Sequence, residues 1–381
     1  MRPIFGSLVL AAALAWPAHS QEVPRIPLRV GLTIVTAAHE SDGDYESIKT
    51  FISEDAKSLR LKYSSESAVP GDILNEPSQY VQYRPHPSNP DQVIEMVNVY
   101  RTVLRSDLKT SDHYVRMFPP PPAVPETVPG TTAVGISARL LNEFKSRGAA
   151  ALTTYYAIFD PQPLSSADTA DGPQPFVGTL ARVEKGDVSL PVIVNGKLVT
   201  LPAVHVKGQM LDVDAEFWFL DDPDNPLALR YAFDKTRLNV IRINFPGDSA
   251  TMAAADGLDS GIEQSLAKTG HADVYGIYFG FNSDVIRPES EPVLKEIAAL
   301  MTKHPVWKLH VDGHTDNVGG ADFNLALSTR RSAAVKKALV ERYRIGAMRL
   351  VATGFGLSAP KATNDTLEGR ALNRRVELSR E

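Results

Sequence analysis

The most regular pattern of apolar residues lies in the C-terminal third of the chain. Apolar side chains recur there at spacings of three, four and seven residues, at Leu327, Ala334, Val335, Ala338 and Leu339. This is the period of one buried face of an α-helix. The pattern predicts a helix over residues 321–343.

Arg331 places a charge on this apolar face. It lies four residues after Leu327 and four before Val335, so its side chain leaves the helix in the same direction as theirs. Asn324, seven residues earlier, shares the face. An unpaired buried guanidinium is too costly to keep. Arg331 therefore requires either an internal acidic partner or an anionic ligand, such as a carboxylate held by two parallel hydrogen bonds.

Strand and helix patterns alternate around this helix. Strands are predicted over residues 274–281, 307–312, 350–354 and 374–378. A second helix is predicted over residues 288–303, because Pro288 suits a first helical turn and Pro305 follows as a stop. Alternation of this kind implies an α/β sandwich, here of the βαβαββ type, with helices on one face of a small mixed sheet.

Strand patterns dominate residues 21–260, which we interpret as a β-rich region of unknown role. Strands are expected over residues 29–38, 151–159 and much of 176–245. Asn195-Gly196 marks a tight hairpin in the last of these segments. Together with the C-terminal sandwich, this region gives the chain an α+β fold class.

Helices and connectors are fewer in this N-terminal region. A helical pattern covers residues 45–61, and residues 137–147 predict a short helix that ends at Gly148, which suits a left-handed cap. Six prolines over residues 119–129 indicate an extended connector, so a division into two subdomains near it is open. Residues 261–271 are expected to link the two halves.

The chain begins with features of an export signal. Arg2 precedes an apolar run over residues 4–16, and residues 18–20 form a small-x-small cleavage site. The run is too short to span a bilayer well, so we interpret residues 1–20 as a cleaved secretory signal peptide. We expect an exported protein in the periplasm, associated with the outer membrane.

Composition narrows the class of protein further. The chain has no cysteine, which excludes disulfides, thiolate metal sites and a lipidated N-terminal cysteine. From residue 271 onward there are 16 Lys and Arg against 13 Asp and Glu, whereas the rest has 24 against 32. A weakly basic C-terminal part suits an anionic polymer, and nothing indicates a nucleic-acid partner.

Fixed positions in and before the predicted 321–343 helix resemble a known family. The pattern T-D-x-x-G-x(4)-N-x-x-L-S-x-x-R is present as Thr315, Asp316, Gly319, Asn324, Leu327, Ser328 and Arg331. A second pattern, G-R-A-x-N-R-R-V-E, covers residues 369–377. Together they resemble the OmpA-like peptidoglycan-binding domain of OmpA, Pal-type lipoproteins and MotB-type stator proteins. The resemblance extends over residues 272–381, and the fold it implies agrees with the predicted sandwich.

The resemblance implies a site for the diaminopimelate of the peptidoglycan stem peptide, which carries an ammonium and carboxylates close together. Asp316 would contact the ammonium, and Arg331 would contact a carboxylate. The further candidate contacts are Asn324, Asn282, Thr315 and Asn317, followed by Arg375 and Asn373 in the closing pattern. Asn282 could equally shape a turn, and Asn324 could equally bond its own helix backbone. Gly280 departs from the family, because relatives commonly carry an acidic residue there.

A metal site is the alternative for the same segment. His310, Asp312, His314 and Asp316 alternate, so a continuous strand would align them on one face, where they could ligate zinc. We expect Gly313 to break the strand, and the family pattern accounts for the histidine and aspartate that follow it. No metal and no cofactor are therefore predicted.

These observations favour a non-enzymatic module that binds peptidoglycan and anchors or positions an exported protein at the cell wall of a Gram-negative-type envelope. The alternative is a cell-wall enzyme or an outer-membrane barrel protein whose OmpA-like domain only targets it to peptidoglycan. Residues 21–260 contain no credible Ser/His/Asp grouping, and Asp168-Thr169-Ala170 is expected to be a loop rather than a protease triplet. Outer-membrane or envelope proteins are candidate partners of this N-terminal region.

Overall fold

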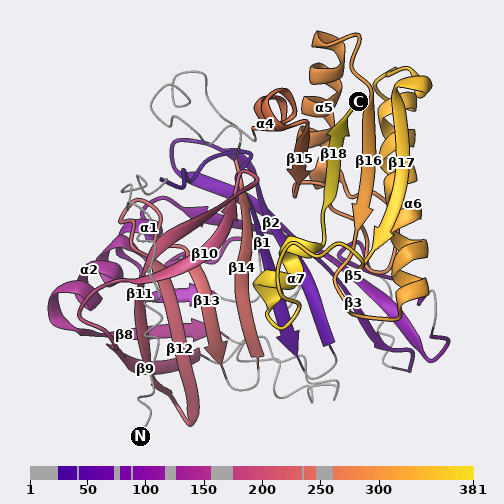
Figure 1. The fold of residues 1–381 in the computed structure, drawn as a ribbon. Coiled ribbons are helices and arrows are strands. Elements are labelled where there is room, and N and C mark those ends of the chain that lie inside the picture. Colours follow the sequence, from indigo (N-terminus) through magenta and orange to yellow (C-terminus); the bar gives the residue numbers. More distant parts are fainter. Residues whose placement is uncertain are drawn as a thin grey trace, which may run out of the picture.

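The computed structural model describes residues 25–40, 43–72, 78–86, 89–115, 126–155, 175–233, 236–245 and 261–381. They form a large N-terminal sheet, residues 25–245, and a smaller C-terminal unit, residues 261–381 (Figure 1). The predicted signal peptide, the Asp168 triplet and most of the proline-rich connector lie outside the described residues.

Fourteen strands form the N-terminal sheet within the described residues. They are β1 (Thr33–Glu40), β2 (Gly43–Glu54), β3 (Ser58–Pro70), β4 (Val81–Pro85), β5 (Gln92–Leu104), β6 (His113–Val115), β7 (Thr131–Thr132), β8 (Ala149–Tyr155), β9 (Pro175–Arg182), β10 (Val188–Val194), β11 (Lys197–Met210), β12 (Val213–Leu220), β13 (Ala228–Phe233) and β14 (Thr236–Asn244). Their order is β4-β5-β3-β2-β1-β14-β13-β12-β11-β9-β8-β6-β7, with β10 paired to β11 and β14. Most pairs are antiparallel, and strands on both sides of the proline-rich connector belong to this one sheet.

The strand-rich character predicted for this region is confirmed, and two local predictions hold in detail. Helix α2 (Ala138–Arg147) begins at Ser137, whose Oγ accepts a hydrogen bond from Leu140 N, and ends at Gly148 in the left-handed conformation. The β10–β11 hairpin turns at Asn195 and Gly196, with φ of 45° and 79°. These motifs are recognisable because neighbouring residues alone decide them. The other helix here, α1 (Asp107–Thr110), is a single turn.

The helical pattern over residues 45–61 is wrong, because this segment forms β2 and the start of β3. Strand β3 pairs with β5 over its whole length, from Ser58 opposite Leu104 to Pro70 opposite Gln92. Its buried residues alternate with half-buried ones at the start, as in a strand with one face in the core. Pairing on both sides therefore overrides the local helical preference.

The C-terminal unit is a four-stranded mixed sheet with helices. Its elements are α4 (Ile262–Thr269), β15 (His271–Val274), the 3₁₀ turn η1 (Pro288–Ser290), α5 (Glu291–Lys303), β16 (Leu309–His314), α6 (Ala321–Glu341), the 3₁₀ turn η2 (Ala347–Arg349), β17 (Leu350–Gly356), α7 (Leu367–Asn373) and β18 (Val376–Arg380). The order is β15-β18-β16-β17, with β16 and β17 parallel and the other pairs antiparallel.

This arrangement differs from the expected βαβαββ order, because helix α7 separates the last two strands. Two strand boundaries also differ. The strand predicted over residues 274–281 is wrong, because β15 covers His271–Val274 and the residues after it form only an isolated bridge between Phe279 and Ile286. Gly313 does not break its strand, since β16 continues to His314 with a register irregularity against β17.

Helices α5 and α6 build the core of the C-terminal unit against its sheet. Leu294 and Ile297 of α5 and Val335 and Leu339 of α6 are fully buried in one cluster with strand residues such as Val311. Gly313 lets α6 approach β16 closely, because a Cβ at this position would collide with the backbone oxygen of Ser328. This contact fixes the turn of α6 that carries Arg331.

The C-terminal unit docks on the N-terminal sheet through α7 (Figure 1) and through the segment around Tyr278. A shared apolar cluster contains Val35, Ala37, Ile48 and Ile241 of the sheet with Tyr278 and Ala371 of the C-terminal unit. Beside it, Glu368 of α7 accepts hydrogen bonds from Arg230 and Asn239 of the sheet. The two regions are thus joined by both apolar and polar contacts.

In the part of the chain that the structure describes, no helix has the length and apolar character needed to cross a membrane.

Candidate functional site

A cavity of about 830 Å³ lies between the N-terminal sheet and the C-terminal unit. Loops and helix α6 of the C-terminal unit line one side, and residues of β1 to β3, with β14, line the other. The volume falls in the range of roughly 300–1,000 Å³ that is usual for small-molecule sites. Six of the eight candidate contacts named from the sequence line this cavity: Asn282, Thr315, Asp316, Asn324, Arg331 and Arg375.

Arg331 reaches the cavity from α6 without an acidic partner. Its Nε donates to the backbone oxygen of Ser283 at 2.9 Å, and its Nη2 lies 3.5 Å from the oxygen of Gly280. The guanidinium lies over the Phe279 ring, 4.9 Å from its centroid. Among the described residues, no carboxylate pairs with Arg331, and its Nη1 has no hydrogen-bond partner.

The charge of Arg331 persists despite its surroundings. Burial, together with repulsion from Arg374, lowers the pKa of Arg331 to about 10, and the carboxylates of Glu46 and Asp316 oppose this shift. A pKa of this size keeps the guanidinium protonated at neutral pH. The cavity therefore contains a cation whose remaining donors face open space rather than an internal acid.

Asp316 is buried and fixed by the C-terminal unit itself. Its Oδ1 accepts from the backbone N of Val318 at 3.0 Å, and its Oδ2 accepts from Nη1 of Arg374 at 2.5 Å. Each carboxylate oxygen has two lone pairs, so Asp316 retains acceptor capacity toward the cavity. Asp316 and Arg331 do not pair with each other.

Arg374 links this aspartate to the N-terminal sheet. Its Nε and Nη2 donate to Glu46 of β2 at 3.0 and 2.6 Å, and Arg242 of β14 donates to the same carboxylate at 2.6 Å. Burial would lower the pKa of Arg374, but Glu46 and Asp316 raise it above its ordinary value. Two acids and two arginines thus satisfy one another across the domain interface.

Glu46 is held in the charged form by these arginines. Burial raises its pKa, but the Arg242, Arg374 and Arg331 guanidiniums outweigh this effect and lower the pKa to about 2. The side chain is only about a quarter exposed, at 26%, so solvent screens these charges weakly. Glu46 remains an anion throughout the physiological range of pH.

Three neutral residues shape the cavity around the charges. Asn324 is buried and donates from Nδ2 to the oxygen of Val318 at 3.0 Å, which closes the loop before α6. Thr315 is buried, and its Oγ1 has no hydrogen-bond partner among the described residues. Asn282 has a φ of 48°, so it does shape a turn, and its Nδ2 lies 3.4 Å from Nε2 of His86.

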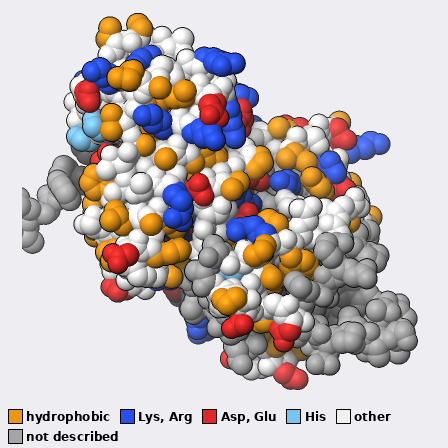
Figure 2. Space-filling model, turned by 90° about the vertical axis from the view of Figure 1, so that its right-hand side faces the viewer, with side chains coloured by type: hydrophobic (Ala, Val, Ile, Leu, Met, Phe, Trp, Pro, Cys, Tyr) orange, Lys and Arg blue, Asp and Glu red, His pale blue; other side chains and the backbone are white. Residues whose placement is uncertain are grey.

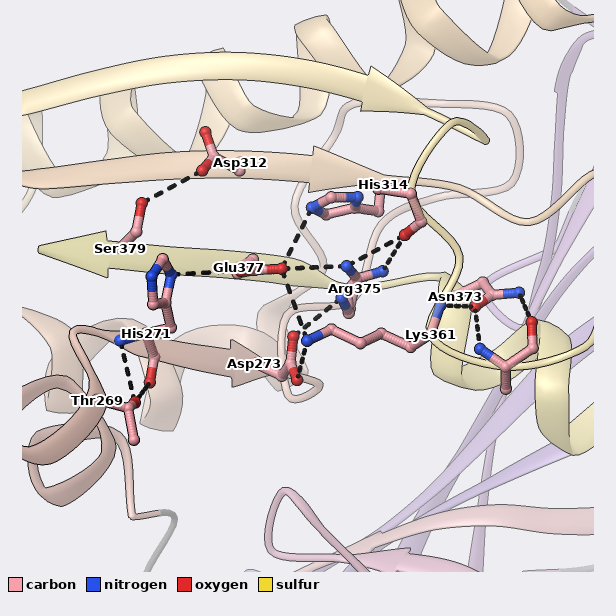
Figure 3. A network of polar contacts seen from close by, with 12 residues as sticks. Thr269, His271, Asp273, Asp312, His314, Lys361, Asn373, Arg375, Glu377 and Ser379 are labelled. Carbon is pink, nitrogen blue, oxygen red and sulfur yellow. Dashed lines mark hydrogen bonds and ion pairs between the residues drawn. The ribbon is translucent and has the colours of Figure 1, made fainter.

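Three predicted residues are either outside the cavity or engaged within the fold. Asn317 is exposed and does not line the cavity. Asn373 is fully buried and bonds the backbone of residues 361 and 362 through both ends of its amide. Arg375 borders the cavity, but its guanidinium bonds Asp273, Glu377 and the oxygen of Ala359 (Figure 3).

His314, which the metal alternative requires, lies in this same network (Figure 3). It is buried and stacked on Phe355, and neither ring nitrogen has a hydrogen-bond partner among the described residues. Burial and the Arg375 guanidinium lower the pKa of His314 to about 4, so the ring is neutral at pH 7. Within the described residues, no group of three or more His, Asp or Glu side chains could hold a metal ion.

The residues that the N-terminal sheet adds to the cavity were not predicted. Glu46 and Glu66 lie directly opposite each other on β2 and β3, and Arg242 comes from β14. No local pattern marks these positions, because their closeness to α6 exists only after the two regions dock. Arg374 was visible in the closing pattern, but its pairing with Asp316 was not.

The charges on the protein surface do not indicate which kind of ligand binds. On the face shown in Figure 2, the described basic, acidic and hydrophobic side chains are interspersed. Long-range attraction of a polymer depends on a continuous field of one sign. The unpaired guanidinium in the cavity is therefore the more specific electrostatic feature.

The sequence is similar to two outer-membrane proteins and a motility protein over about a quarter of its length. It is 42% identical over 101 residues to outer membrane porin F of Pseudomonas aeruginosa, covering 26% of this chain and 29% of that protein. It is 36% identical over 102 residues to the outer-membrane lipoprotein YfiB of the same organism, covering 27% and 60%. It is also 37% identical over 106 residues to motility protein B of Bacillus subtilis, covering 27% and 41%.

Among solved structures, the peptidoglycan-associated lipoprotein of Burkholderia pseudomallei is 30% identical, over 28% of this chain and 88% of that chain, with a TM-score of 0.26. The chain spans less than one third of the porins and Omp38 proteins that it matches. The model of the OmpA family matches residues 278–374, which include α5, β16, α6, β17 and α7. Residues 278–374 of this chain therefore form an OmpA family domain.

Proposed function

We propose that the C-terminal unit binds peptidoglycan without chemical turnover, and that it anchors or positions the protein at the cell wall. The ligand group is the diaminopimelate of the stem peptide, whose free end carries one ammonium and one carboxylate. In this proposal Arg331 binds the carboxylate, and Asp316 contacts the ammonium. Thr315, Asn324 and Asn282 shape the space between them.

The observation that carries this proposal is the unpaired guanidinium of Arg331. A buried charge without a partner is costly, and the 830 Å³ cavity beside it has room for a partner from outside. An arginine fork presents two parallel donors to a carboxylate. A carboxylate ligand would supply the hydrogen bonds and the negative charge that the described residues do not.

Asp316 is suited to a cation because its orientation is fixed before a ligand arrives. Val318 N and Arg374 hold its two oxygens, so binding loses little side-chain freedom. Arg374 also pairs with Glu46, so its positive charge is shared between two carboxylates. Asp316 therefore keeps more of its negative charge for an ammonium than it would in a simple pair with one arginine.

The proposal is one of binding rather than catalysis. A hydroxyl becomes a nucleophile when an adjacent base activates it. Of the hydroxyl side chains that line the described part of the cavity, Ser67 and Thr315 form no hydrogen bond to a histidine. Incubation with purified sacculi should therefore release no muropeptides, and release by the wild-type protein would favour the enzymatic alternative.

The relatives are named as outer-membrane proteins and lipoproteins and, in one solved structure, as a peptidoglycan-associated lipoprotein. These names support an envelope location on the periplasmic side, consistent with the signal peptide predicted at residues 1–20. The N-terminal sheet would then face the periplasm or its envelope partners while the C-terminal unit holds peptidoglycan.

Co-sedimentation with purified sacculi tests the proposal. The wild-type protein and the Arg330→Ala variant should sediment with the sacculi, because Arg330 is exposed and adjacent in sequence but does not line the cavity. Folded Arg331→Ala should remain in the supernatant. Equal sedimentation of Arg331→Ala and wild type would contradict the proposal.

A further inference from the structure

The N-terminal sheet brings a second partly engaged charge to the same cavity. Glu66 of β3 lines it, and its Oε2 accepts from the backbone N of Phe281 at 2.8 Å and from Nη2 of Arg84 at 3.0 Å. Its Oε1 has no hydrogen-bond partner among the described residues and is not enclosed by protein. One oxygen is thus held in place while the other is available.

Glu66 and Arg331 lie on two sides of one residue, Gly280. A Cβ built on Gly280 would lie 3.0 Å from Oε2 and 3.4 Å from Oε1 of Glu66. Nη2 of Arg331 lies 3.5 Å from the backbone oxygen of the same glycine. The carboxylate therefore occupies the space that a side chain at position 280 would enter, close to the unpaired guanidinium.

The pairing of β2 with β3 explains why this carboxylate points into the cavity. Glu46 and Glu66 are direct partners across the two strands, so their side chains project from the same face of the sheet. Both carboxylate oxygens of Glu46 accept hydrogen bonds, one from Arg374 and the other from Arg242. Glu66 is engaged at one oxygen only, which makes it the anionic group of the sheet with spare capacity toward a ligand.

We propose that Glu66 contacts the ammonium of the ligand, so that the binding site is composite and needs the N-terminal sheet as its second wall. This inference rests on the proposed function and adds a second acidic residue that contacts the ammonium of the same ligand. Beside Asp316, which also retains acceptor capacity, Glu66 Oε1 and Arg331 Nη1 form a pair of opposite charge from different regions. Such a pair selects a zwitterionic group and disfavours a purely anionic one, which Glu66 would repel.

Titration calorimetry of the full chain with a soluble disaccharide tripeptide that ends in diaminopimelate tests the contact. Glu66→Gln should weaken the dissociation constant by about tenfold to a hundredfold, the usual effect of losing one charged hydrogen bond. Glu54→Gln is the matched control, because it removes one carboxylate from neighbouring strand β2, where Glu54 pairs with Arg105 outside the cavity. Its affinity should equal that of the wild type.

A second variant tests whether the loss of binding in Glu66→Gln reflects the contact itself rather than altered folding. Gly280→Ala changes no charge, but its Cβ would press on the Glu66 carboxylate and should weaken binding severalfold. The decisive readout uses the same probe with its diaminopimelate amine acetylated. Acetylation should weaken binding to the wild type by a larger factor than binding to Glu66→Gln, because the variant has already lost one of the two acidic contacts to the ammonium and keeps only Asp316.

The outcomes separate this inference from the proposed function. If the wild type does not bind the probe, or if Arg331→Ala binds it equally well, the proposed function fails. If the probe binds and Arg331→Ala loses it while acetylation weakens wild type and Glu66→Gln by the same factor, Glu66 does not contact the ammonium and only this inference fails. Stronger binding by Glu66→Gln would also overturn it, because the sheet would then shield the site rather than complete it.

Discussion

Two arginines in the C-terminal unit are both withdrawn from solvent, yet they face opposite electrostatic surroundings. Arg375 bonds the carboxylates of Asp273 and Glu377 and a backbone oxygen, and Lys361 completes the network (Figure 3). Arg331 bonds only backbone oxygens and has no acid within ion-pair distance among the described residues. Arg375 therefore belongs to a satisfied internal network of ion pairs, whereas Arg331 lies beside a cavity and lacks an acidic partner.

This difference shows how a buried charge can be assigned to folding or to binding. Removing one partner from a satisfied buried network leaves the others unpaired and costs stability. Removing a charge that has no partner costs the fold much less and acts on whatever the charge was placed to bind. The two arginines therefore predict opposite phenotypes.

The largest expected effect is on the folding of the paired network. Arg375→Ala should lower the free energy of unfolding by about 3–5 kcal/mol, because Asp273 and Glu377 lose their shared partner. Arg331→Leu should lower it by clearly less. Urea unfolding of both variants measures this, and equal destabilisation would remove the distinction between the two regions.

The next effect is on binding at the unpaired region. Asp316→Ala should cost on the order of 2–5 kcal/mol of peptidoglycan binding, as for truncation of a buried charge at an interface. It also leaves Arg374 with Glu46 alone, so a check of folding by circular dichroism accompanies the binding assay. Retention of wild-type affinity by a folded variant would exclude Asp316 from the site.

A pH dependence of stability is expected from His314, which lies beside the paired network. The pKa of His314 is lowered from 6.5 to about 4 in the folded chain, so the unfolded chain binds more protons between these values. Stability should therefore fall as pH falls from 6.5 to 4, by roughly 2–3 kcal/mol. His314→Leu should flatten this slope in thermal unfolding scans, and an unchanged slope would assign it to other groups.

The smallest effect is expected at Asn317. This residue is exposed and outside the cavity, although it belongs to the predicted set. Asn317→Ala should change binding by less than about 0.5 kcal/mol. A large loss in the sacculus assay would mean that the ligand extends beyond the cavity onto this loop.

The sequence predicted the parts of the site that lie close together along the chain. The spacing from Leu327 to Val335 correctly placed Arg331 on the inward side of α6, and the loop before it carries Asp316 and Thr315. Asn373 and Arg375 were candidates for the same reason, but their side chains are used within the fold. A motif identifies residues that occur together, whereas only packing decides which of them face the cavity.

The second wall could not be predicted, because it depends on strand pairing and docking. The segment around Glu46 has a helical pattern, yet β2 and β3 pair over most of their length and bring Glu46 opposite Glu66. Both residues then meet a helix more than 250 positions later in the sequence. Neither hydrophobic period nor turn chemistry contains this information.

The central claim is that Arg331 receives the ligand carboxylate. The most direct measurement compares the soluble disaccharide tripeptide with the same probe amidated at the side-chain carboxylate of diaminopimelate, using wild type and Arg331→Ala. Amidation should weaken binding to the wild type by roughly 30-fold or more, equivalent to at least about 2 kcal/mol, and should not weaken binding to Arg331→Ala further. An equal loss in both proteins would place the carboxylate elsewhere and contradict the account.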